Sequence, residues 1–128
     1  MAQLFFLLEH NLAPLQPILR TMGHSTFLPY EPEIGLPMQT DDPIIIARIV
    51  EQKMNLGIDR IIITKDKKFL THIGTAPIKL IVLIDKTTNY EIYDMNLKQL
   101  CGVLVDKALK MVGKEGQVID YIECSKFY

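Results

Sequence analysis

Cysteine is scarce in this chain of 128 residues, where only Cys101 and Cys124 occur. Two isolated cysteines cannot build a disulfide framework or a zinc site of the usual ligand spacing. We therefore interpret them as reduced thiols that pack inside a cytoplasmic protein. The length suits one domain over residues 1–128, with a core large enough to be stable without disulfides or metals.

Long apolar runs and an excess of one charge are also absent. The apolar run over residues 2–8 lacks a preceding basic region and ends at Glu9 and His10, so it does not predict a signal peptide. No later run approaches the roughly 18–20 residues of a membrane helix. Lys plus Arg number 14 and Asp plus Glu 15, for a net charge of -1, which excludes a strongly basic nucleic-acid coat protein but allows a local basic patch. We expect a cytoplasmic protein without a membrane segment.

Several common catalytic motifs are missing from the sequence. It contains no glycine-rich phosphate loop, no His-Glu-x-x-His and no Gly-x-Ser-x-Gly. His10, His24 and His72 do not share the spacing of metal ligands, and we interpret them as surface or packing residues. Any chemistry must therefore come from other residues.

Short apolar runs alternate with amphipathic segments along the chain. The runs predict strands over residues 3–8, 24–28, 60–64, 78–84 and 118–122, with a short extra strand over 89–93. Helical spacing predicts helices over about 12–22, 43–54 and 97–112, with Asp42 and Asn96 as the N-caps of the last two. The alternation predicts the α/β class, with a mainly parallel sheet and helices on both faces.

The longest irregular segment is punctuated by four prolines between residues 29 and 43. Long irregular loops in compact domains often carry function. The other prominent feature is a set of acids near strand ends: Glu9 follows the first strand, Asp66 follows the 60–64 strand, and Asp42 begins the intervening helix. Each also has a plain structural explanation, because Asp42 can cap its helix, Asp66 lies in a charged turn, and Glu9 can be a loop residue.

The carboxyl ends of parallel strands meet at one edge of an open sheet. Three carboxylates gathered there would repel one another unless a cation lay between them. Mg²⁺ or Mn²⁺ suits oxygen ligands, and such a cation can activate water and stabilise charge on a phosphate. Glu9, Asp42 and Asp66 are therefore the candidate metal ligands and catalytic residues.

Three segments of the chain together resemble a known family. Residues 7–12 (LLEHNL), 40–45 (TDDPII) and 61–69 (IIITKDKKF) are similar to the motif blocks of the short PIN-like proteins, which are small predicted Mg²⁺-dependent ribonucleases and often toxins of toxin–antitoxin pairs. The resemblance spans residues 4 to 85, and its most specific part is the pattern of Thr64, Asp66 and Phe69. It implies a three-layer PIN-like fold.

The resemblance also implies roles for individual residues. Asp66 becomes a metal ligand with Thr64 as a neighbouring polar contact, Asp42 or Asp41 becomes the acid at the helix start, and Asn11 lines the site. Two positions depart from the family pattern. Glu9 stands where the family usually has Asp, and Lys68 stands where it usually has an acid, so that its ammonium would weaken metal binding.

These observations favour a metal-dependent ribonuclease that acts on single-stranded RNA and has an antitoxin protein as a partner. In this hypothesis Glu9, Asp42 and Asp66 hold Mg²⁺ or Mn²⁺, and the RNA backbone is attracted by Lys65, Lys67 and Lys68. Asn11 and Thr64 are further candidate RNA contacts. The alternative is a PIN-like domain that has lost catalysis and acts as a binding or regulatory module. A receiver-like phosphoacceptor domain is a weaker alternative, because Glu9 and His10 are not the adjacent acidic pair that it needs.

Two further expectations concern packing and association. Ile62, Leu100 and Leu104 should be core residues, whereas Lys98 and Lys110 should face solvent. The mean hydropathy of +0.16 and the common pairing of small domains suggest a homodimer. Its candidate interface residues are Tyr90, Tyr93, Phe127 and Tyr128.

Overall fold

The computed structural model describes residues 3–85 and 92–128, and these residues form a five-stranded, all-parallel sheet in the order β2-β1-β3-β4-β5. The strands are β1 (Phe5–Leu8), β2 (Ser25–Phe27), β3 (Ile61–Thr64), β4 (Lys79–Ile84) and β5 (Val118–Glu123). The predicted α/β class is confirmed, with a sheet that is parallel throughout. Most of the predicted extra strand over 89–93 lies outside the described residues, and its last two residues belong to the 3₁₀ helix η3 (Ile92–Asp94).

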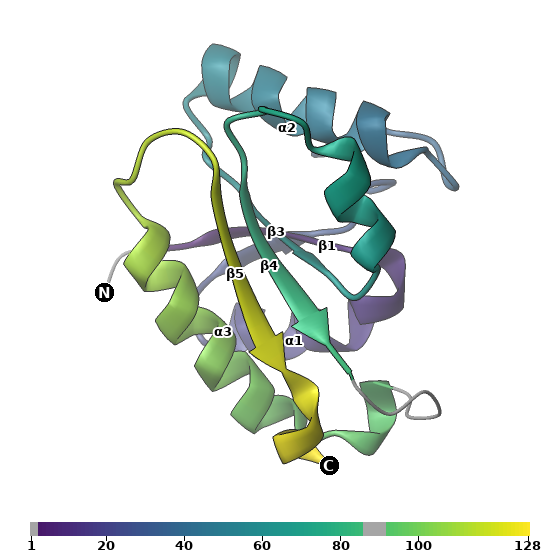
Figure 1. Cartoon of the computed structure of the whole chain (residues 1–128), viewed down its shortest axis with the longest axis vertical. Helices are drawn as coiled ribbons and strands as arrows, with labels where there is room; N and C mark the ends of the chain where they lie inside the picture. Colours follow the sequence, from purple (N-terminus) through teal and green to yellow (C-terminus); the bar gives the residue numbers. More distant parts are fainter. Residues whose placement is uncertain (1–2, 86–91) are drawn as a thin grey trace.

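Helices cover both faces of the sheet (Figure 1). The 3₁₀ helix η1 (His10–Leu15), α1 (Gln16–Thr21) and α3 (Leu97–Met111) pack on one face. On the other face lie α2 (Asp42–Leu56) and the 3₁₀ helix η2 (Lys67–His72). A last 3₁₀ helix, η4 (Cys124–Phe127), follows β5. None of the described helices is long and apolar enough to cross a membrane.

The predicted first helix is in fact two shorter ones. Its chain forms a 3₁₀ helix as far as Leu15 and an α-helix only from Gln16, with Pro17 in the first turn of the latter. A proline lacks the N–H that a continuous helix would need at that position, so the hydrogen-bond ladder restarts there. Residue 22, the last of the predicted helix, lies outside it, because Met22 follows the end of α1 and is 40% exposed.

The start of α2 also differs from the prediction by one residue. The N-cap is Asp41 rather than Asp42, because the Asp41 carbonyl accepts from the backbone N–H groups of Ile44 and Ile45. Asp42 therefore lies inside the first turn, where a carboxylate interacts favourably with the helix dipole. Along the helix, Ile46 and Ile49 are buried, whereas Ile45 and Val50 are only half-buried.

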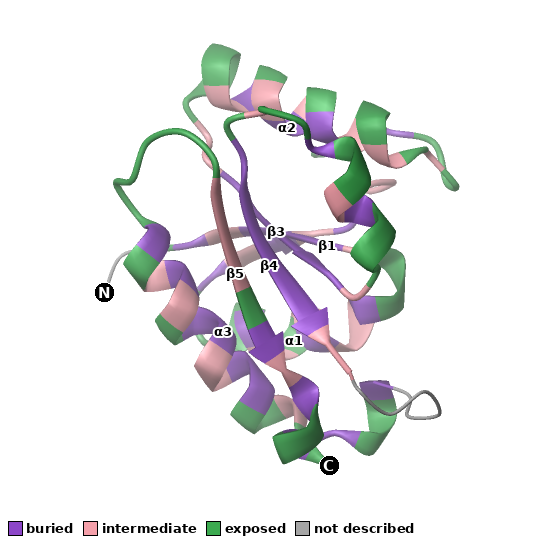
Figure 2. Cartoon of the chain, viewed as in Figure 1, coloured by how far each residue is buried: buried purple, intermediate pink, exposed green. Residues whose placement is uncertain are grey.

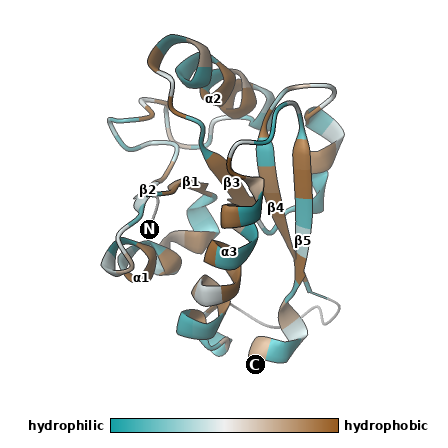
Figure 3. Cartoon of the chain, turned by 90° about the vertical axis from the view of Figure 1, so that its left-hand side faces the viewer, coloured by the Kyte–Doolittle hydropathy of each residue, from teal (hydrophilic) through white to brown (hydrophobic). Residues whose placement is uncertain are grey.

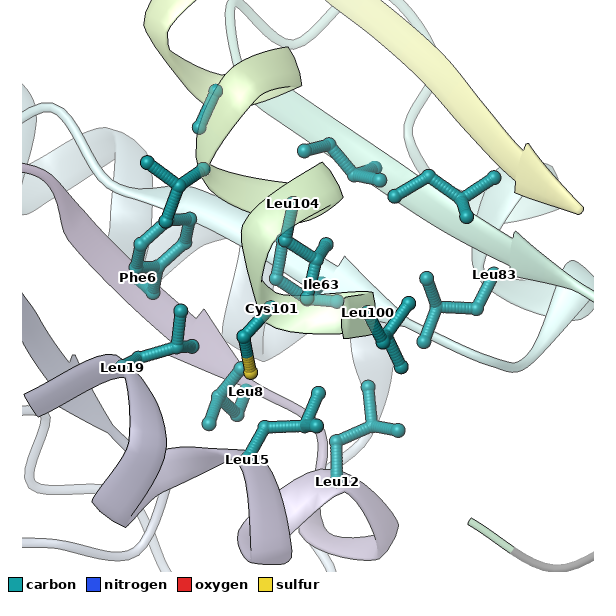
Figure 4. Close-up of a cluster of buried hydrophobic side chains, with 14 of the residues drawn as sticks. Phe6, Leu8, Leu12, Leu15, Leu19, Ile63, Leu83, Leu100, Cys101 and Leu104 are labelled. Carbon is teal, nitrogen blue, oxygen red and sulfur yellow. The ribbon is translucent and has the colours of Figure 1, made fainter. Parts of the chain in front are cut away.

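Two apolar layers enclose the sheet, and each contains alternate residues of the central strands. Phe6, Leu8 and Ile63 pack with α1 and α3 (Figure 4), and Leu7 and Ile62 pack under α2. Burial on both faces explains the nearly continuous apolar runs of β1, β3 and β4 (Figure 2). In contrast, the edge strand β5 carries both polar and apolar residues (Figure 3).

The predicted core of α3 is confirmed. Leu100 and Leu104 are fully buried, Lys98 and Lys110 are exposed, and Ile62 is buried in the layer under α2. The predicted cap is present as well, since the Asn96 side chain accepts a hydrogen bond from the Gln99 N–H at 3.2 Å. Cys101 and Cys124 are free and buried, and burial raises the pKa of each thiol to about 11.

One candidate interface residue was misassigned from the sequence. Phe127 is only 2% exposed, because η4 turns its ring into the layer that contains α3. Tyr93 and Tyr128 are exposed, at 76% and 37%, and Tyr90 lies outside the described residues. Tyr128 is also held in place, since its hydroxyl donates a hydrogen bond to the Asp85 carboxylate.

Candidate functional site

The strand order reverses between β1 and β3, and the candidate residues follow these two strands. β1 lies between β2 and β3, so the connections on its two sides run in opposite directions. Leu8 is paired with Ile63, and the Glu9 N–H donates to the Ile63 carbonyl at 3.1 Å, which brings Glu9 beside the end of β3. In open parallel sheets, ligands bind outside the carboxyl ends of strands at such a reversal.

The Glu9 carboxylate is held by the end of β3. The Thr64 hydroxyl donates to Oε2 of Glu9, and the Lys65 N–H donates to the same oxygen at 3.2 Å. Asn11 is a weaker contact, with its Nδ2 at 3.5 Å from Oε1. These donors fix the carboxylate over β3 and compensate its charge.

Asp66 is positioned by the turn that follows β3. It is the N-cap of η2, and its Oδ1 accepts a hydrogen bond from the Lys68 N–H at 2.9 Å. The Asp66 N–H in turn donates to the Thr64 hydroxyl oxygen at 3.1 Å. Thr64, which is 1% exposed, therefore connects Glu9 to Asp66 through a single hydroxyl.

Glu9, Asp42 and Asp66 line one pocket of about 210 Å³. The three acids come from three separate segments of the chain: the end of β1, the first turn of α2 and the turn after β3. Thr64 belongs to the same lining. Much of the rest of the wall is apolar and includes Pro29, Tyr30, Pro37, Ile45 and Phe69.

The carboxylates of the pocket interact electrostatically. Burial raises the pKa of Asp42 above its ordinary value, and the negative charges of Asp66, Glu9 and Asp41 raise it further, while His72 acts in the opposite direction. A carboxyl group in this position is less easily ionised, because its charge loses hydration and meets like charges. A bound cation would relieve this repulsion.

The donor set suits a hard cation, although the side chains are not gathered into a closed metal site. Among the residues that the structure describes, no three His, Cys, Asp or Glu side chains lie close enough together to hold a metal ion. Mg²⁺ is commonly bound by only one or two carboxylates, with water and substrate phosphate as its other ligands. Asp42 and Asp66 can supply these carboxylates, with Glu9 held beside them by Thr64.

The predicted RNA-contacting residues do not all face the pocket. Thr64 lines it, whereas Lys65 and Asn11 line a neighbouring hollow that also includes His10 and Tyr93. Lys67 and Lys68 are exposed and line neither of these two cavities.

Two features of the site were not predicted from the sequence. His10 and Tyr30 both line the pocket, and His72 lines a small hollow beside Asp41 and Asp42. The only signal for Tyr30 was its place in the proline-punctuated segment. The histidines gave none, because three isolated histidines have no informative spacing.

Comparisons with known proteins do not identify a family. No family model, curated protein or solved structure matches this chain. Function must therefore be inferred from the pocket at the reversal point of the sheet and from the chemistry of its side chains.

Proposed function

We propose that the protein is a PIN-like, metal-dependent ribonuclease that hydrolyses phosphodiester bonds of single-stranded RNA. The observation that carries the proposal is the shared pocket of Glu9, Asp42 and Asp66 at the reversal point of an all-parallel sheet. The resemblance of the three motif blocks to short PIN-like proteins adds the substrate class. A three-layer PIN-like fold, a toxin role and an antitoxin partner belong to the proposal on that resemblance alone.

Each side chain has a distinct task in this proposal. Asp42 and Asp66 hold Mg²⁺ or Mn²⁺, which when bound supplies a more acidic water and offsets negative charge on the phosphate. Thr64 and the Lys65 N–H hold Glu9, whose carboxylate adds negative charge beside these two acids. Lys65, Lys67 and Lys68 lie close in sequence to this site and attract the RNA backbone.

The test is cleavage of a fluorescent single-stranded RNA with Mn²⁺ or Mg²⁺. Wild-type protein should cleave it, EDTA should stop cleavage, and Asp66→Asn should abolish it because the neutral amide is a poor cation ligand. The matched control is Asp106→Asn, the same change at an exposed acid of α3, which should cleave like wild type. Wild-type protein without activity, or Asp66→Asn with full activity, would refute the proposal.

A second candidate is a PIN-like module that binds or regulates without catalysis. It is favoured by the engagement of Glu9 with Thr64 and Lys65, and by the absence of a three-residue metal cluster in the described part of the chain. A cation site that works should raise the melting temperature in millimolar Mn²⁺, because ligands that bind only the folded state stabilise it. Wild type and Asp66→Ala melting alike, with no Mn²⁺ shift in either, would favour this second candidate.

A further inference from the structure

Two aromatic side chains in the pocket have no task in the proposed hydrolysis. The rings of His10 and Tyr30 lie with centroids 5.6 Å apart and planes inclined by 57°. His10 Nδ1 is 3.2 Å from the Tyr30 hydroxyl, and Tyr30 packs against the apolar layer that contains α1 and α3. The pair is therefore anchored to the core while it lines the pocket that contains the three acids.

The pocket is large enough for an aromatic ring. Its volume is about 210 Å³, and an apolar protein cavity of about 150 Å³ accommodates benzene. A single six-membered ring with small substituents therefore fits. The prolines 29 and 37, Ile45 and Phe69 give such a ring apolar walls.

The same irregular segment also brings an amide into the lining. Gln39 lines the pocket and has a φ of 62°, in the left-handed region of the backbone that residues other than glycine rarely adopt. Thr40 beside it also lines the pocket, and its hydroxyl is held by the Pro37 carbonyl. An amide side chain offers both a donor and an acceptor, which matches the hydrogen-bonding edge of a base.

We propose that this pocket binds one unstacked base of RNA, with Tyr30 and His10 as its aromatic wall and Gln39 at its polar edge. The inference rests on the proposed function, which identifies the ligand as a nucleic acid. It makes the affinity for RNA depend on an unstacked base as well as on the charged backbone. Stacking on aromatic side chains is the usual way in which proteins hold single-stranded bases.

The test measures binding of short fluorescent oligonucleotides by anisotropy, with Mg²⁺ and again with EDTA. The probes are tetrauridylate, tetra-adenylate and an abasic oligonucleotide of the same length, so that the backbone charge is constant. Tetrauridylate should bind about tenfold more tightly than the abasic probe, since stacking one base on an aromatic residue commonly gives such a factor. Tyr30→Ala should remove this difference, and Tyr30→Phe should keep it.

The matched control is Tyr121→Ala, because Tyr121 is exposed on β5 and does not line this pocket. If Tyr30→Ala does not fold, the exposed residue His10 is changed to Ala in its place. Competition by free uridine for wild-type protein provides the second readout. An abasic probe that binds as tightly as tetrauridylate and tetra-adenylate would overturn the inference. So would equal losses in Tyr30→Ala and Tyr121→Ala.

The two proposals fail in different ways. Cleavage that depends on Asp66, together with equal binding of base-bearing and abasic probes, would overturn the base pocket and leave the ribonuclease proposal standing. Base-dependent binding that is lost in Tyr30→Ala, without cleavage by the wild type, would establish the pocket in a non-catalytic module.

Discussion

Thr64 connects the parts of the candidate site through one buried hydroxyl. It donates to Glu9 Oε2 and accepts from the Asp66 N–H, so the end of β1 and the turn after β3 are held in a fixed relation. Thr64 is buried and Glu9 is half-buried, and a hydrogen bond to a charged group contributes about 1.5–3 kcal/mol, more than one between neutral groups. The position of both acids therefore depends on a residue that need not touch substrate.

Thr64→Val tests this dependence because it removes the hydroxyl and keeps the branched shape. We expect unfolding in denaturant to show a loss of about 1–3 kcal/mol, together with reduced RNA cleavage. Thr21→Val is the control, at an exposed hydroxyl at the end of α1, and should change stability by about 0.5 kcal/mol or less. Equal effects in the two variants would contradict the role assigned to Thr64.

Asp42 should make stability depend on pH in a direction opposite to that of most carboxylates. Its pKa is raised first by burial and then by Asp66, so the folded protein keeps this proton to a higher pH than the unfolded chain does. Stability from this group is therefore present at low pH and is lost as the pH rises through the folded-state pKa.

The variant Asp42→Asn removes that titration. Its gain in melting temperature over wild type should be larger at pH 7 than at acidic pH, because the wild-type carboxyl takes up its proton as the pH falls. Asp106→Asn, at an exposed acid on α3, should show no such pH-dependent gain. A gain that is the same at both pH values would show that Asp42 carries no unfavourable charge in the folded protein.

We expect Lys68 to affect cation binding less than its position in the sequence suggested. It does not line the pocket, and it is not among the charges that shift the pKa of Asp42. Its described contact with Asp66 is made by the backbone N–H. Because exposed charges are screened by solvent and salt, Lys68→Asp should change the calorimetric Mn²⁺ affinity by less than about threefold. A tenfold gain would place its ammonium in the site.

Among the elements, α3 shows how apolar residues at helical spacing form a single buried face. Its buried residues include Leu100, Leu104 and Ala108, and the Asn96 side chain caps its first turn. In contrast, the prolines near the first helix interrupt the hydrogen-bond ladder, so equally apolar spacing there gives η1 followed by α1.

Leu104→Ala should cost about 2–5 kcal/mol, because Leu104 is fully buried and its truncation leaves a cavity in the core. Lys110→Ala, on the exposed side of the same helix, should stay within about 0.5 kcal/mol. Chemical denaturation of both variants checks the difference. The reverse order would mean that the buried face of α3 has been assigned incorrectly.

The molecule as a whole offers exposed tyrosines for self-association. Tyr93 and Tyr128 remain accessible, whereas Phe127 is excluded from an interface by its burial. We predict a homodimer, and light scattering over a range of concentrations should show twice the chain mass. Tyr93→Ser should shift the protein toward monomer, and Lys114→Ser, at an exposed residue of the loop before β5, should not. A wild-type monomer at every concentration would contradict the prediction.

Local patterns in the sequence were sufficient to predict the class of the fold and the type of each main element. The apolar runs of β1, β3 and β4 predicted buried strands because residues buried on both faces must be apolar throughout. The period of α3 predicted its buried face, and Glu9, Asp42 and Asp66 were singled out because strand ends in a parallel sheet share one edge. All of these are local patterns, which a single segment can reveal.

The order of the strands and the contacts between distant segments became known only from the folded structure. Strand order placed the reversal between β1 and β3, and pairing of Leu8 with Ile63 brought Glu9 to Thr64, which lies 55 residues further along the chain. The burial of Phe127 and the meeting of His10 with Tyr30 likewise required the complete fold. No local pattern predicts these contacts, because they are stabilised by surfaces that become neighbours only when the chain is folded.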